Sequence, residues 1–236
     1  DLAMGLASKG VATIRYDKRN FKYKKNFSAR EGQFTLGEET VNDALSAIKL
    51  VKDFTYLDTN RIYVLGHSLG GYAAPLIAEQ SDEVDGIIVF AGPSVTLQDI
   101  IVDQHKFLMA QDGKTSWLEK QVIKAQVKKA KKITAGEYDS LTPASKLMAY
   151  WPGTWWQSVA EYDPVKTANN LHVPVMIMQG DDDYQVEAER DYARWKKELT
   201  KSDAEFKLYE GLNHLFVRGE GEKGPGQYFI PGNIEE

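Results

Sequence analysis

Short apolar runs alternate along most of the chain with segments in which apolar residues recur at helical spacing. The runs that predict strands lie near residues 11–14, 62–65, 86–90, 173–178 and 206–209. Between them, stretches such as residues 41–51 place their apolar side chains on one face of a helix. Regular alternation of strands and helices predicts an α/β fold, in which a mostly parallel sheet is flanked by helices.

This alternation stops between residues 94 and 165, where helical stretches occur without a clear strand. We therefore predict one α/β domain over residues 1–236. Its core is expected to consist of residues 1–93 and 166–236, with a helical lid inserted at about 94–165.

The inserted segment is rich in aromatic residues and in lysine. Trp151, Trp155 and Trp156 are candidates for an apolar wall over a substrate pocket, and plain core packing is the alternative. Six lysines between residues 117 and 132 predict a solvated helix face rather than an anion site.

Composition excludes several classes of function. With 29 basic and 34 acidic residues, the chain carries a net charge of −5, which gives no broad basic surface for nucleic acid. No cysteine is present, so disulfides and a thiol nucleophile are excluded. No apolar run is long enough for a membrane span. The sequence also has no recognisable metal-ligand cluster or phosphate-binding loop, so we predict neither a metal nor a cofactor. The cellular compartment stays undetermined.

Residues 66–70 read GHSLG and match G-x-S-x-G, the motif of a nucleophile elbow. In this motif a strand turns sharply into a helix with the serine at the apex, and the glycines leave room for the backbone to cross. By composition, a chain of this length contains roughly 0.1 such matches by accident. An apolar run precedes the motif and a helical pattern follows it, so we predict that Ser68 is a catalytic nucleophile.

A serine nucleophile needs a base, and four histidines compete for that role. His67 lies inside the elbow, His105 lies in the inserted segment, and His172 precedes a predicted strand. His214 follows the last predicted strand, at the carboxyl edge where open α/β sheets build their sites. Elimination and placement predict His214 as the base.

The acid of such a triad is expected between the serine and the histidine in chain order. Asp181, Asp182 and Asp183 directly follow the strand predicted at 173–178. Periodicity does not choose among them, and a solvated turn is the alternative for each.

Four segments resemble the α/β-hydrolase superfamily, in particular its bacterial serine aminopeptidase-like or dienelactone hydrolase-like branch. They read RYDKR at 15–19, VLGHSLGG at 64–71, QGDDDYQV at 179–186 and LNHLF at 212–216, and together they span nearly the whole chain. The resemblance implies the α/β-hydrolase fold and cleavage of a carboxylic ester through an acyl-enzyme on Ser68. The family places its acid in G-x-x-D-x-x-V, which corresponds here to Asp183, with Asp181 as the runner-up.

The resemblance also implies parts that this sequence lacks. The family sheet has eight strands, of which the third lies between the two predicted here at 11–14 and 62–65. The backbone N–H of Leu69 is expected to be one oxyanion donor, and the second belongs to a loop after that third strand. We therefore expect N-terminal strands and the second donor to be missing from this chain. Alone, it would be weakly active or inactive, aggregation-prone, or completed by another chain.

Other functions remain open at this point. A serine peptidase or an acyl thioesterase would use the same triad. An incomplete, non-catalytic hydrolase fragment or a binding module is the alternative of another class. The expected partner is a small-molecule ester, and a homo-oligomer or a completing chain is possible.

Overall fold

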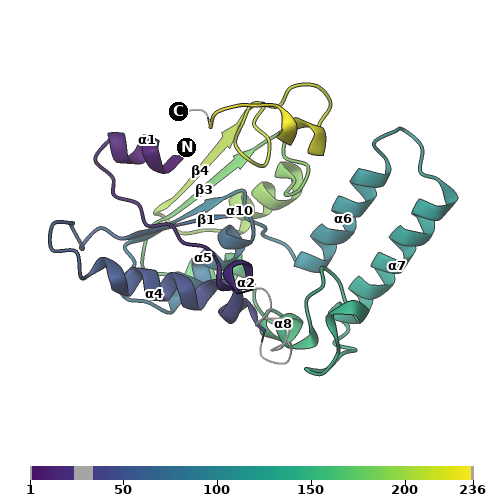
Figure 1. Ribbon diagram of the computed structural model, residues 1–236, viewed down its shortest axis with the longest axis horizontal. Helices are drawn as coiled ribbons and strands as arrows, with labels where there is room; N and C mark the ends of the chain where they lie inside the picture. Colours follow the sequence, from purple (N-terminus) through teal and green to yellow (C-terminus); the bar gives the residue numbers. More distant parts are fainter. Residues whose placement is uncertain (1, 24–33, 235–236) are drawn as a thin grey trace.

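The sheet at the centre of the molecule has four parallel strands in the order β1-β2-β3-β4 (Figure 1). The computed structural model describes residues 2–23 and 34–234. In register, Leu65 pairs with Ile88, and Ile88 with Met176. The parallel sheet with flanking helices confirms the predicted fold class. The strands are β1 (Tyr63–His67), β2 (Gly86–Phe90), β3 (Val175–Gly180) and β4 (Ala204–Tyr209).

Helices cover one face of this sheet, which the alternating side chains of the strands make apolar. Ile87, Val89, Val175 and Ile177 point to that face and are at most 2% exposed. The helix α5 (Leu69–Glu79) packs against β1 and β2 there. The other helices are α1 (Leu2–Ser8), α2 (Arg19–Lys22), η2 (Gly37–Val41), α4 (Asn42–Val51), α6 (Leu97–Met109), α7 (Trp117–Thr134), η3 (Ala144–Lys146), α8 (Gly153–Ser158), α9 (Pro164–Asn170), η4 (Ala188–Tyr192), α10 (Ala193–Glu198) and η5 (Pro225–Phe229).

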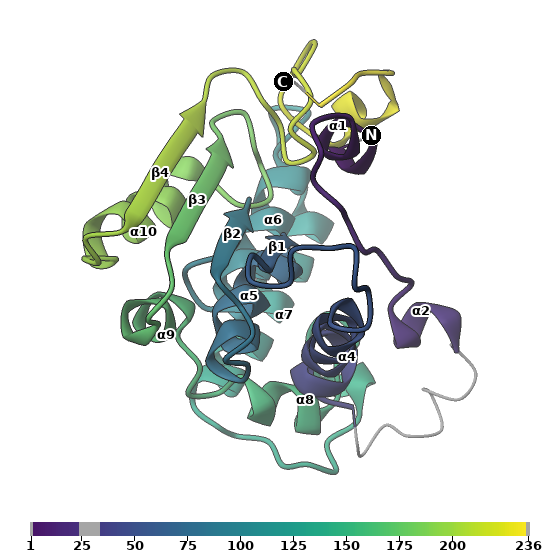
Figure 2. The same ribbon diagram turned by 90° about the vertical axis from the view of Figure 1, so that its left-hand side faces the viewer.

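The strand predicted at residues 11–14 does not form. These residues are extended but unpaired, and Val11 and Ile14 are 48% and 40% exposed. Figure 2 shows the segment that carries α1 and α2 on the β1 side of the sheet, away from β4. A strand needs a neighbour for its backbone N–H and C=O groups, and within the described residues β1 pairs with β2 alone. An apolar, β-branched run without a neighbouring strand therefore stays a loop.

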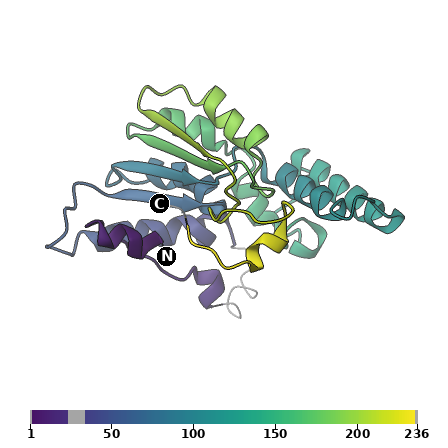
Figure 3. The same cartoon turned by 90° about the horizontal axis from the view of Figure 1, so that it is seen from above.

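The segment between β2 and β3 is helical throughout its regular parts, as expected for residues 94–165. Its helices α6 and α7 pack against each other and project from the sheet as an arm (Figures 1 and 3). A capping box fixes the start of α7, since Ser116 accepts from the Glu119 amide and Glu119 accepts from the Ser116 amide. Trp117, at the first position of α7, is 70% exposed.

Two of the three tryptophans assigned to a pocket wall belong instead to the core. Trp155 is 0% exposed and Trp156 1%, so neither presents surface to a substrate in this structure. Trp151 stacks on Trp155 with ring centroids 3.7 Å apart. Trp155 Nε1 donates to Glu39 Oε2 at 2.8 Å, which fastens α8 to η2. Burial of that carboxyl group raises the pKa of Glu39.

Candidate active site

Ser68 occupies the turn between β1 and α5 in a backbone conformation that non-glycine residues rarely adopt. Its φ is 55° and its ψ is −119°, and His67 and Leu69 beside it belong to the strand and the helix. The Ser68 amide donates to the carbonyl of Phe90 at 3.0 Å, which ties the apex to the end of β2. Strain of this kind, on the order of 1–3 kcal/mol, persists only where the surrounding structure imposes it.

Two glycines make the sharp turn possible. A Cβ atom on Gly66 would lie 2.1 Å from the carbonyl oxygen of Gly70, and one on Gly71 would lie 2.8 Å from Cα of Gly92. Both distances are far below van der Waals contact, so any side chain would push the strand and the helix apart. Gly70 has nothing within 4 Å of the same point, so close packing does not require glycine there.

Asp183 and His214 form a buried pair at the carboxyl ends of β3 and β4. Their Oδ2 and Nδ1 atoms are 2.7 Å apart, and the two residues are 0% and 4% exposed. A carboxylate bound to Nδ1 holds that proton in place and leaves Nε2 free to accept another. The pair thus has the arrangement of an oriented base.

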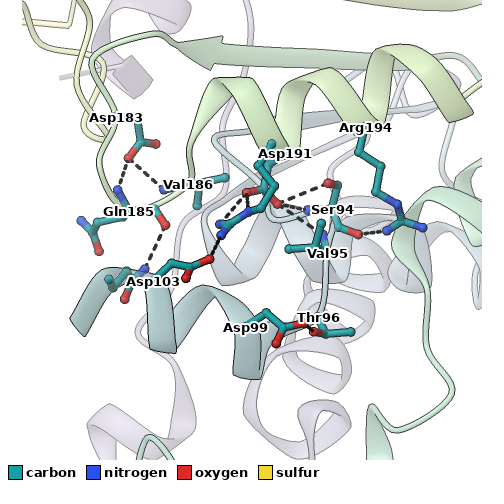
Figure 4. A network of polar contacts seen from close by, with 12 residues as sticks. Ser94, Val95, Thr96, Asp99, Asp103, Asp183, Gln185, Val186, Asp191 and Arg194 are labelled. Carbon is teal, nitrogen blue, oxygen red and sulfur yellow. Dashed lines mark hydrogen bonds and ion pairs between the residues drawn. The ribbon is translucent and has the colours of Figure 1, made fainter. Parts of the chain in front are cut away.

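The Asp183 carboxylate is held by three further donors. Oδ1 accepts from the amides of Gln185 and Val186 at 2.8 and 3.1 Å (Figure 4). Oδ2 also accepts from Gln179 Nε2 at 3.0 Å. Gln179 in turn donates to the carbonyls of Gly180 and Val186, so its orientation is fixed. With all lone pairs engaged, a fully buried carboxylate is kept in one geometry.

The neighbouring aspartates have different partners. Asp181 Oδ1 accepts from the Gly211 amide at 2.7 Å, and Asp182 Oδ2 accepts from Gln227 Nε2 at 2.6 Å. Both side chains therefore stabilise the loops that surround the pair, and the structure places Asp183, rather than its neighbours, against His214.

His67 joins the elbow to the loop that carries His214. Its Nε2 lies 2.8 Å from the carbonyl oxygen of His214, and the two ring centroids are 4.7 Å apart. Loss of solvent around the packed part of the ring, and secondly the nearby His214, lower the pKa of His67 below its usual value. Among the described residues, no hydrogen bond joins the Ser68 hydroxyl to His214, and the elbow contacts the His214 loop through His67.

The remaining histidines lie outside the site. His105 Nδ1 donates to the Ile101 carbonyl at 2.7 Å within α6, and His172 is exposed before β3. The loop with His214 is closed by Asn213, whose amide donates to the Val217 carbonyl at 3.0 Å.

A buried polar cluster that the sequence did not reveal connects the start of the inserted segment to the helix after Asp183. Asp191, 0% exposed, accepts from the Ser94 amide at 2.8 Å, the Val95 amide at 3.3 Å and Arg190 at 2.9 Å (Figure 4). Arg190 also binds Asp103 of α6 at 2.5 Å. In the sequence, these charges are indistinguishable from solvated charges on a helix, and no local signal marks Asp191 as buried.

The same helix α6 reaches the loop of the acid. Gln104 Nε2 donates at 3.1 Å to the carbonyl of Gln185, whose amide binds Asp183. The inserted segment is therefore attached to the loop of the Asp183–His214 pair.

Two kinds of feature are absent from the described residues. Residues 2–23 and 34–234 contain no group of three His, Cys, Asp or Glu side chains suited to a metal ion. No helix formed by the same residues is both long and apolar enough to cross a bilayer.

Comparison with known proteins gives the same classification as the motifs. Residues 1–221 match the family described as "Serine aminopeptidase, S33". The chain is 34% identical to esterase EstD of Thermotoga maritima over 237 aligned residues. This alignment covers all of the chain but only 53% of EstD, so the chain spans about half the length of that relative. Among solved structures, Est1E of Butyrivibrio proteoclasticus with bound ferulic acid superposes with a TM-score of 0.57 at 18% identity, over 90% of this chain and 73% of the other. The resemblance of its motifs is thus confirmed, and the chain belongs to the serine aminopeptidase-like (S33) family of α/β hydrolases.

Proposed function

We propose that this chain supplies the triad of a serine esterase, with Ser68 as nucleophile, His214 as base and Asp183 as acid. The observation that carries the proposal is the buried Asp183–His214 pair, 2.7 Å apart, whose loop contacts His67, the residue just before a serine with a φ of 55°. Structural pairs of Asp and His are common, but a strained serine on a strand–helix turn beside one is typical of acyl transfer.

The proposed chemistry has two halves. Ser68 Oγ attacks the ester carbonyl carbon while His214 Nε2 takes its proton, and the proton then goes to the departing alcohol as the acyl-enzyme forms. Water, deprotonated by the same nitrogen, attacks the acyl carbon, the bond from that carbon to Ser68 Oγ breaks, and His214 returns the proton to Oγ as the acid is released. Asp183 stabilises the imidazolium in both halves, because the ionised carboxylate already binds Nδ1.

Charge on the tetrahedral oxygen needs backbone donors. Leu69 begins α5, so its amide is one of the N–H groups that have no partner within the helix. We assign this amide to the oxyanion site. The helix N-terminus also places a partial positive charge beside the nucleophile.

An ester is the favoured substrate class because the 34% identical relative is named an esterase. The triad alone would serve an amide or a thioester equally, and the chain spans only about half of that relative. Substrate class therefore has to be measured rather than read from the fold.

The test is a fluorophosphonate probe together with a panel of p-nitrophenyl esters, aminoacyl anilides and acyl thioesters. We expect the wild-type chain and a Ser46→Ala control to label, since Ser46 lies exposed on α4, and Ser68→Ala not to label. Equal labelling of Ser68→Ala would contradict the nucleophile. Faster cleavage of anilides or thioesters than of esters would show that the proposed substrate class is wrong, while the proposed triad would still stand.

A further inference from the structure

His67 stands between the nucleophile and the base, yet its side chain has no part in the proposed proton transfers. It is the last residue of β1, so its position is fixed by the sheet through the pairing with Phe90. Its ring reaches across to the next loop, where Nε2 lies 2.8 Å from the His214 carbonyl oxygen. A carbonyl oxygen only accepts, so the hydrogen bond requires a proton on Nε2 and sets the tautomer of His67.

The acceptor of this bond belongs to the residue that carries the base. His214 is 4% exposed, and a buried backbone carbonyl that lacks a donor destabilises the folded state. The donor that the structure provides comes from the nucleophile elbow rather than from the His214 loop itself. The distance between elbow and base is thereby set through one hydrogen bond.

The Asp182 amide also holds the loop two residues before His214, by donating to the Leu212 carbonyl at 3.1 Å. The contacts of the His214 ring and of Phe216 constrain the distance to the elbow less closely. Asp183 holds the ring at Nδ1, which fixes its orientation toward β3. Phe216 stacks on Phe90 with centroids 3.5 Å apart, which presses the far end of the loop on β2. Stacked rings slide more easily than a hydrogen bond bends, since dispersion is non-directional whereas hydrogen bonds weaken steeply with angle.

We propose that His67 is a positioning residue for His214: its Nε2–H holds the His214 backbone at the distance from Ser68 that proton transfer needs. This inference rests on the function proposed above. A displacement of about 1 Å of a catalytic group typically lowers the rate about 10²-fold. Because His67 does not contact the ester, its loss should lower kcat and leave KM nearly unchanged.

The test compares His67→Phe, which keeps a ring and removes the donor, with His67→Gln, whose Nε2 lies at a similar reach and restores it. His172→Phe, at an exposed position before β3, is the matched control. We expect kcat for p-nitrophenyl acetate to fall 10- to 100-fold in His67→Phe, to return to within about threefold in His67→Gln, and to stay unchanged in the control. KM should differ by less than about twofold throughout.

Amide hydrogen exchange over residues 211–219 gives a second readout that does not depend on activity. His67→Phe should accelerate exchange in this loop, and His67→Gln should restore the wild-type rate. If the wild-type chain proves inactive, the proposed function fails while exchange still decides whether His67 holds the loop. Unchanged exchange in His67→Phe overturns the inference, as does a loss of kcat that Gln does not rescue.

Discussion

Replacement of Asp183 by Asn tests the proposed triad most sharply, because the structure predicts which hydrogen bonds survive. The new Oδ1 still accepts from the amides of Gln185 and Val186. The new NH₂ group takes the place of Oδ2, the oxygen that in the wild type accepts from Gln179 Nε2 and from His214 Nδ1. Gln179 cannot turn over to help, since its NH₂ also donates to two backbone carbonyls.

The NH₂ group of the substituted side chain is a donor and faces the Nδ1–H of His214, which is also a donor. The substitution therefore favours the other tautomer of His214, with the proton on Nε2. In that tautomer the base cannot accept the serine proton. Replacement of a triad Asp by Asn typically lowers kcat about 10⁴-fold, which corresponds to about 5 kcal/mol of activation free energy. Loss of a buried, charge-assisted bond should also lower the free energy of unfolding by about 1–3 kcal/mol.

The matched controls are the neighbouring substitutions Asp181→Asn and Asp182→Asn. Their partners are the Gly211 amide and Gln227, so they disturb loops but not the base, and kcat should stay within about tenfold of wild type. The assay is steady-state hydrolysis of p-nitrophenyl acetate, with urea unfolding to separate stability from chemistry. If Asp183→Asn retains more than a tenth of the activity while a neighbour abolishes it, the assignment of the acid is wrong.

Three further predictions concern the triad, the nucleophile turn and the buried Glu39. Ser68→Ala and His214→Ala should each lower kcat about 10⁶-fold, and the double variant should lose little more, because triad members act as a unit. If the loss in the double variant equals the product of the two single losses, Ser68 and His214 do not act in the same step. Gly66→Ala should lower the free energy of unfolding by about 3 kcal/mol or more, because the added methyl group would lie 2.1 Å from a backbone oxygen. Gly70→Ala should leave that free energy unchanged, because nothing lies within 4 Å of its added methyl group. Equal denaturation midpoints for the two variants would disprove this. Burial raises the pKa of Glu39, so the folded state binds its proton more tightly than the unfolded state, and stability falls as pH rises from the usual glutamate pKa to the raised one. Glu39→Gln should abolish that fall in thermal unfolding measured from pH 4 to 8, and a parallel pH dependence in both proteins would refute it.

The nucleophile turn could be predicted from sequence because its causes are local. A strand-to-helix reversal within five residues requires glycine where the two backbone segments cross, and the motif states that requirement directly. In the structure, the close approaches of Gly66 and Gly71 are that crossing. Gly10, which follows α1, has a φ of 82°, a left-handed conformation that also favours glycine for a local reason.

The acid was a harder assignment because it depends on the shape of a loop. Asp181, Asp182 and Asp183 have the same chemistry, and each ends up as an acceptor for a different donor. The turn after Asp183 decides which aspartate contacts the histidine, because it brings the amides of Gln185 and Val186 within hydrogen-bond distance of Asp183. Residue pattern contains no information on that turn, and the family motif was needed to choose.

Pairing and burial across long sequence distances were beyond prediction. Residues 11–14 have the composition of a strand, but composition cannot supply the neighbour that a strand needs. The concentration of Trp151, Trp155 and Trp156 suggested a pocket, whereas a carboxyl group 116 positions earlier, that of Glu39, draws Trp155 into the core. An aromatic cluster fits either environment, and only the three-dimensional partner decides.

The order of strands explains why the long insertion leaves the candidate site intact. The inserted helices lie between β2 and β3, yet these strands are direct neighbours, with Phe90 opposite Met178. Phe90 also anchors Ser68, and Asp183 follows β3 within a few residues, so the segments that carry Ser68 and Asp183 are held by one stretch of sheet. Closing a longer loop between paired strands costs only about 0.6 kcal/mol for each doubling of its length. The length of the insertion can therefore vary at little cost while β2 and β3 hold Ser68 and Asp183 in register, whereas Gln104, which donates to the carbonyl of Gln185, ties α6 to the loop of Asp183.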